Sequence, residues 1–154
     1  MFNQRSGFRQ GDSSYLALAG RQLFAVAFIL ASAGHFTPAA IASAAQQGVP
    51  VPGLLVPFSG VIALAGGLSL LLGYRARLGA CLLLVFLVPV TLMMHAFWAV
   101  SDPAMFSIQL ALFVRNLMML AAALFIAHAG AGSLSLDALL AERELDYEAR
   151  TVIH

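Results

Sequence analysis

One arginine and one asparagine interrupt an otherwise apolar stretch, FSIQLALFVRNLMMLAAALFIAH, over residues 106–128. A charged side chain at the centre of a bilayer costs about 2.5–3.5 kcal/mol on insertion scales, so such residues normally face the protein interior. Arg115 and its neighbour Asn116 can bind a carbonyl or anionic oxygen of a ligand. They can equally lock helices together by binding freed backbone carbonyls and hydroxyls. The sequence leaves both interpretations open.

Other polar side chains are expected near the depth of Arg115 if the apolar stretches are membrane-spanning helices. Arg115 lies about 14 Å inside its helix at 1.5 Å per residue, and its long side chain can extend toward the outer surface. Two histidines fall near the outer ends of their helices, with a threonine and a tryptophan on the face of the second. We therefore predict a polar site in the outer half of the bundle, formed by Arg115, His95, His35, Asn116 and Thr91, with Trp98 at its mouth and Ser59 and Gln109 as further candidates.

The sequence offers no complete catalytic or metal-binding set. Cys81 is the only cysteine, which excludes an intrachain disulfide and a CxxC redox pair. The two outer histidines lack an HxxxH pattern or a second pair, which argues against a haem or a metal ion between them. There is no phosphate loop, no nucleophile elbow and no basic stripe for nucleic acid. We therefore expect neither a metal site nor catalysis by this chain alone.

Composition places the chain in a membrane. Of its 154 residues, 61% are hydrophobic and 10% are charged, whereas about 25% charge is usual for soluble domains. A spanning helix needs about 20 mostly apolar residues, and four stretches qualify: residues 16–36, 54–73, 78–100 and 106–128. We predict an all-α integral membrane four-helix bundle over residues 16–130. Residues 1–15 precede it, and an acidic tail, residues 131–154, is expected to form a short helix capped by Ser135.

The arginines set the predicted orientation. All eight basic residues are arginine. Apart from Arg115, they fall on one side of a four-span protein: Arg5, Arg9, Arg21, Arg75, Arg77, Arg143 and Arg150. The positive-inside rule then places both termini in the cytoplasm. The first span also resembles a secretory signal peptide, but its apolar run exceeds the usual 7–15 residues, so we expect it to be retained.

Small residues are expected to bring the helices together, because helices in lipid are not driven together by the hydrophobic effect. Ser59, Ala63 and Gly67 form a row at every fourth position, with Gly60 and Gly66 beside it. This pattern predicts that the second span packs closely against its neighbours.

Several short segments recur in a fixed order through almost the whole chain. They are Arg21 with residues 33–36, then residues 48–50, 66–73, Arg75 with Arg77, residues 95–98, 113–117 and 130–137. Together they resemble the DoxX family of small bacterial membrane proteins. The resemblance implies a four-helix inner-membrane protein associated with redox systems, whose relatives occur as subunits of quinone-linked sulfur oxidation and as partners of oxidative-defence enzymes. It also implies that lysine is more frequent in the family at the position of Arg115. Arginine keeps the positive charge of lysine and adds planar, bidentate hydrogen bonding.

These observations predict a small bacterial inner-membrane subunit that assists a redox partner and binds a quinone or lipid headgroup in the outer half of its bundle. Its expected partners are membrane lipid and a protein of a larger membrane complex. The alternative is a purely structural or assembly subunit, since packing faces are abundant and no catalytic set is complete. A small-solute transporter is disfavoured by the low number of helices and the lack of repeated, broken ones. The acidic tail is either a solvated helix or a docking site for a soluble partner.

Overall fold

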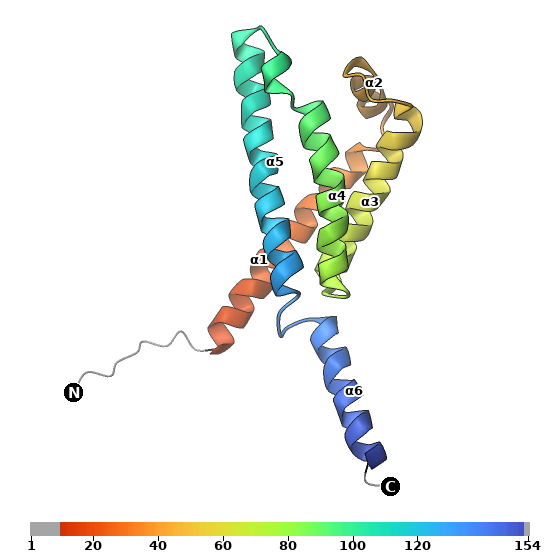
Figure 1. The fold of residues 1–154 in the computed structure, drawn as a ribbon, viewed down its shortest axis with the longest axis vertical. Coiled ribbons are helices and arrows are strands. Elements are labelled where there is room, and N and C mark those ends of the chain that lie inside the picture. The colour runs from red at the N-terminus through yellow and green to blue at the C-terminus, as the bar shows by residue number, and fades with distance from the viewer. Residues whose placement is uncertain (1–9, 153–154) are drawn as a thin grey trace, which may run out of the picture.

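The computed structural model describes residues 10–152, which form only helices and their connections (Figure 1). In chain order these are α1 (Gln10–Gly34), α2 (Pro38–Gln46), α3 (Pro52–Leu72), α4 (Ala76–Met94), the 3-10 helix η1 (Phe97–Ala99), α5 (Pro103–Ala129) and α6 (Leu136–Val152). Four segments are long and apolar enough to cross a membrane: Ser14–Gly34, Pro52–Leu72, Ala76–Ala99 and Pro103–Ala129. The predicted all-α, four-span fold is confirmed.

Two connections differ from the sequence prediction. The segment between the first and second predicted spans, for which no helix was predicted, forms α2. There Thr37 accepts a hydrogen bond from the Ala40 amide, proline occupies the first turn, and alanines favour the helix. The third span was expected to run as a helix to residue 100. Instead α4 ends at Met94 and η1 follows, so the last residues of that span leave the helical register.

The spanning helices pack pairwise in the order α1, α3, α4 and α5. Figure 1 shows α3, α4 and α5 running side by side, while α1 crosses behind them at a steep angle. Both α1 and α6 reach the same end of the molecule, as an even number of spans requires. The cytoplasmic location of that end stays a prediction. In this arrangement α5 is the least buried of the spans. Among the spanning helices it contacts α4 extensively and the others little, so most of its surface stays uncovered.

Glycines let the central helices approach closely. A Cβ on Gly67 would lie 3.2 Å from the backbone oxygen of Ala25 in α1, and one on Gly66 would lie 2.9 Å from that of Gly79 in α4. Ala63, one turn before Gly67, is fully buried. The small residues of α3 therefore allow close contact on two sides of the helix, with α1 and with α4, as the sequence predicted.

A carboxylate contact joins α6 to the turn between α3 and α4. The carboxylate of Asp137 accepts hydrogen bonds from the amides of Arg75, at 2.7 Å, and Ala76, at 3.1 Å. The Asp137 amide donates in return to the Gly73 carbonyl, at 2.9 Å. Asp137 thus satisfies free N–H groups at the start of α4 although it lies in another helix.

Arg21 fastens α1 to the same region. Its guanidinium donates to the backbone oxygens of Ala131 and Leu134 in the linker between α5 and α6, the latter at 3.0 Å. The side chain is buried, with 5% of its surface exposed. Ser135 caps α6 by accepting from the Ala138 amide at 3.2 Å, which confirms the predicted cap. The end of the bundle that carries α6 is therefore held by polar contacts between distant segments.

Gly66→Ala tests the close contact of α3 and α4. The added methyl would also lie 2.7 Å from Leu83, so the two helices must move apart, and we expect a loss of about 1–3 kcal/mol in unfolding free energy. Gly20→Ala in α1 is the matched control, because its methyl meets nothing within 4 Å. Unfolding of both variants in mild detergent is the measurement. Equal stability of the two would contradict the close packing.

Asp137→Ala tests the contact between α6 and α4. Two amides lose their acceptor, so we expect the unfolding free energy to fall by about 1–2 kcal/mol, as for loss of a helix N-cap. Glu144→Ala removes the same charge from an exposed site on the same helix and should change stability little. If both variants unfold alike, the contact contributes nothing beyond its charge.

Candidate functional site

A cavity of about 610 Å³ lies among α1, α2, α3, α4 and α5, toward the end of the bundle that carries α2. Its walls are mainly aliphatic, aromatic and methionine side chains. Four of the six predicted site residues line it: His35, His95, Arg115 and Asn116. Ser59, named as a further candidate, also lines it. The structure therefore brings together residues from the end of α1, the end of α4 and the middle of α5.

Arg115 is weakly partnered within the protein. Its Nη2 donates to Oδ1 of Asn116 at 3.4 Å, at the long limit for a hydrogen bond, and it makes no other contact of this kind to the described residues. The Arg115 side chain is exposed, whereas Asn116 is 2% exposed. None of the described residues that line the cavity is acidic. Arg115 thus lines the cavity while most of its five N–H donors have no acceptor among the described residues.

His95 is positioned by a side chain of α5. It follows the last residue of α4, and its Nδ1 lies 3.0 Å from Oε1 of Gln109. An amide oxygen only accepts, so in this orientation Nδ1 carries the proton. Nε2 of the neutral ring is then an acceptor for a hydroxyl or N–H group. Gln109 is therefore a positioning residue rather than a member of the cavity wall.

His35 is held at the end of α1 by packing. Its Nδ1 lies 3.1 Å from the backbone oxygen of Ala31, one turn back, and its ring meets the ring of Phe86 edge-on with centroids 5.3 Å apart. Gly60 of α3 lies beneath it, where a Cβ would come within 2.7 Å of the histidine Cβ. The close approach of α1 and α3 at Gly60 thus sets the position of this ring.

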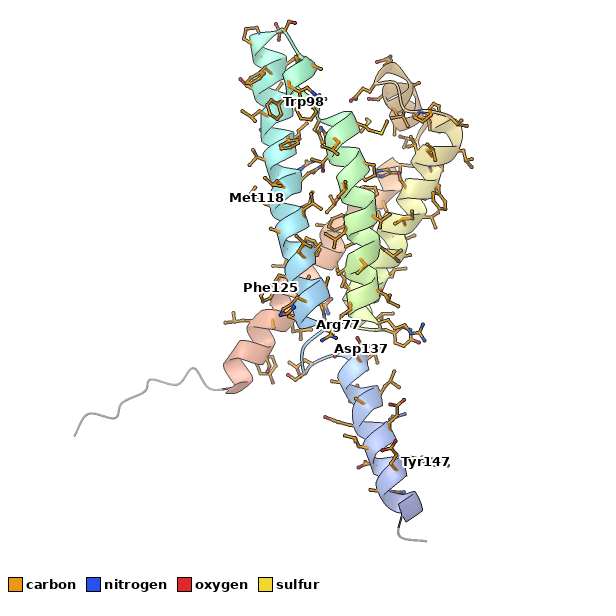
Figure 2. All side chains as sticks on the ribbon, viewed as in Figure 1. Arg77, Trp98, Met118, Phe125, Asp137 and Tyr147 are labelled. Atoms are coloured by element: carbon orange, nitrogen blue, oxygen red, sulfur yellow. The ribbon has the colours of Figure 1, made fainter. Side chains whose placement is uncertain are left out.

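Thr91 and Trp98 do not line the cavity. The Thr91 hydroxyl donates to the Leu87 oxygen of its own helix at 2.6 Å and is buried. Trp98 lies in η1 and packs against Phe97 and Phe113, with ring centroids 5.1 and 5.8 Å away. Figure 2 shows it beside the first turns of α5. Trp98 was placed at the mouth by extending the helical face of His95, and that extension fails because α4 ends at Met94.

Two further features of the cavity involve backbone oxygens of α4. Pro89 lies inside α4 and has no N–H for the Val85 carbonyl; both residues line the cavity, so this oxygen is a candidate acceptor. Gln47, at the end of α2, donates to the backbone oxygens of Met94, at 2.9 Å, and Met93, at 3.2 Å, when its amide nitrogen faces them. Gln47 thereby ties α2 to the end of α4. This contact depends on a connection whose helix was not predicted.

Comparison with known proteins places the chain among small membrane proteins. The protein-family model described as DoxX matches residues 16–96. Inner membrane protein YqjF of Escherichia coli (strain K12) is 28% identical over 123 residues, which cover 80% of this chain and 90% of that protein. No solved structure matches the chain. The family match includes His35 and His95 and ends before α5, so Arg115 and Asn116 lie outside it.

Accessibility of single cysteines tests the predicted orientation and the opening of the cavity. In a Cys81→Ala background, Ser43→Cys places a thiol on the cavity wall in α2, and Ser133→Cys places one at the opposite end of the bundle. A membrane-impermeant maleimide should label the first thiol in right-side-out vesicles and the second in inverted ones. The reverse pattern would place the cavity toward the cytoplasm.

Proposed function

The chain belongs to the DoxX family, and from that premise we propose that it is a membrane-embedded subunit that binds the polar head of a quinone or of a lipid in its cavity and assists a redox partner. The observation that carries the proposal is Arg115, a fixed positive charge that faces the cavity with one long hydrogen bond to a described residue. A ligand oxygen would supply the partners that the guanidinium lacks.

The lining of the cavity favours an amphiphilic ligand. Most of the wall is apolar, and the polar groups are few: Arg115, Asn116, the two histidines and two serines. A volume of about 610 Å³ falls within the range of small-molecule sites, about 300–1,000 Å³. A quinone ring or a lipid headgroup with the start of its chain has this combination of a compact polar part and apolar surface.

The polar groups have complementary roles toward such a ligand. The guanidinium of Arg115 can donate two parallel N–H bonds to the oxygens of an anionic lipid headgroup, or a single one to a quinone carbonyl. Nε2 of His95, left as an acceptor by the bond to Gln109, suits a hydroxyl group such as that of a reduced quinone. No group of three or more His, Cys, Asp or Glu side chains among the described residues could hold a metal ion. The proposed role is to bind the ligand and present it to a partner.

A structural role is the second candidate, and the outer face of α5 favours it. Leu117, Met118 and Phe125 are 53%, 63% and 71% exposed, and Figure 2 shows the last two on the side of α5 away from α4. A neighbouring membrane protein could cover this face. In that case the chain would stabilise a larger complex without a small ligand.

Arg115→Leu tests the proposal directly. The protein is purified in mild detergent and analysed by native mass spectrometry for bound small molecules and co-eluting proteins. We expect the wild type to retain a quinone or a specific lipid, and the variant to lose about tenfold or more in occupancy, since hydrogen bonds to charged groups contribute about 1.5–3 kcal/mol. Arg115→Lys should keep part of it.

Arg143→Leu is the matched control, because it removes an arginine from an exposed site on α6. Retention of the same ligand by Arg115→Leu would overturn the binding role. A stoichiometric protein partner, with no small ligand in either form, would establish the structural role instead.

A further inference from the structure

We propose that the opposite end of the bundle holds a second, separate site, which binds the phosphate of an anionic phospholipid. A cavity of about 610 Å³ lies there between the start of α4, the end of α5 and the linker to α6. Arg75 and Arg77 contribute its positive charge, and residues 129–132 form the facing backbone. Figure 2 shows Arg77 and Asp137 next to each other where the chain passes from α5 into α6.

Both guanidinium groups lack an acceptor among residues 10–152. Neither donates a hydrogen bond to another residue in the part of the chain that the structure describes, and both side chains are exposed. The Arg75 guanidinium carbon lies 5.6 Å from the centre of the Tyr74 ring, which holds it at one edge of the site. Arg77 lies beside Gly130 of the linker, where an added Cβ would lie 3.4 Å from the Arg77 Nε. Gly130 has a φ of +83° and, lacking a side chain, leaves room beside Arg77.

Asp137 also lines this cavity, and its single negative charge offsets only one of the two arginine charges. Its two carboxylate oxygens are bonded to the backbone amides of Arg75 and Ala76. Arg75 itself has a φ of +48°, a left-handed conformation that residues other than glycine rarely adopt. Strained residues of this kind cluster where a structure presents a side chain to a ligand. Asp137 thus binds the backbone that carries Arg75, and the site keeps a net positive charge.

The surroundings of the two arginines favour a phospholipid over a free anion. They flank the point where α3 has ended and α4 begins, so they lie at the boundary between a spanning segment and water. Leu78, one residue after Arg77, is 59% exposed and lines the cavity together with Ala129. A phospholipid can place its phosphate on the guanidinium groups, which bind phosphate through paired N–H donors, and lay an acyl chain along Leu78. An inorganic anion would contact only the polar part of this cavity and would leave Leu78 and Ala129 unused.

The test compares lipid retention by the full chain. Wild type, Arg75→Gln, Arg77→Gln and the double variant are purified in mild detergent, exposed to an equal mixture of phosphatidylglycerol and phosphatidylcholine, and analysed by native mass spectrometry. We expect the wild type to prefer phosphatidylglycerol. Each single variant should lose about fivefold in that preference, as for one arginine at an anionic surface, and the double variant should lose it altogether. Arg77→Lys should keep most of it.

Arg143→Gln is the control, since it removes the same charge from α6 outside the cavity. An equal loss in this control, or a preference that survives in the double variant, would overturn the site. Stabilisation by excess inorganic phosphate alone, equal to that by phosphatidylglycerol and lost in Arg77→Gln, would make it a small-anion site instead. The melting temperature of each variant shows whether it is folded. Because Arg115 lies in the other cavity, either site can fail without the other.

Discussion

A charge placed among membrane-spanning helices must find polar partners inside the protein, because hydrocarbon offers none. Arg21 and Arg115 both lie within spanning helices, and they meet this requirement in opposite ways. Arg21 is buried and donates to two backbone oxygens of a distant linker. Arg115 has one long bond to its neighbour in sequence. The helix-locking role considered for Arg115 is therefore the role that Arg21 performs.

This contrast divides the molecule into two halves. Near the end that carries α6, glycines bring α1, α3 and α4 together, and Arg21 and Asp137 close the connections. Toward the end that carries α2, bulky methionine and phenylalanine side chains surround a cavity. Between the spanning helices, packing is tight at Gly66 and Gly67, and space remains where the large side chains line this cavity; the cavity beside Arg75 and Arg77 lies at the linker to α6, outside that tight contact. A cavity at the end that carries α2 therefore lowers the stability of the fold little, because the contacts at the end that carries α6 hold the helices together.

The sequence predicted the spans and much of the cavity, because both depend on local properties. Apolar length marks a spanning helix, and helical register together with alternating direction places His35, His95, Arg115 and Asn116 at similar depth. The structure places two of the predicted residues outside the cavity wall: Trp98 follows the end of α4, and the Thr91 hydroxyl bonds its own helix. The contacts of Asp137, Gln47 and the linker with Arg21 join residues far apart in sequence. No local pattern could have identified them.

The two candidate functions place different demands on the membrane. Exposed apolar residues on the outer face of α5 are satisfied by acyl chains, since lipid tails are as apolar as leucine. Such a face permits a protein partner but does not need one. The free N–H groups of Arg115 are not satisfied by acyl chains, and the described cavity wall offers no carboxylate. An oxygen from a bound headgroup or quinone meets that need, and a neighbour packed on the outer face of α5 does not. This asymmetry is the physical reason to place the ligand site ahead of the structural role.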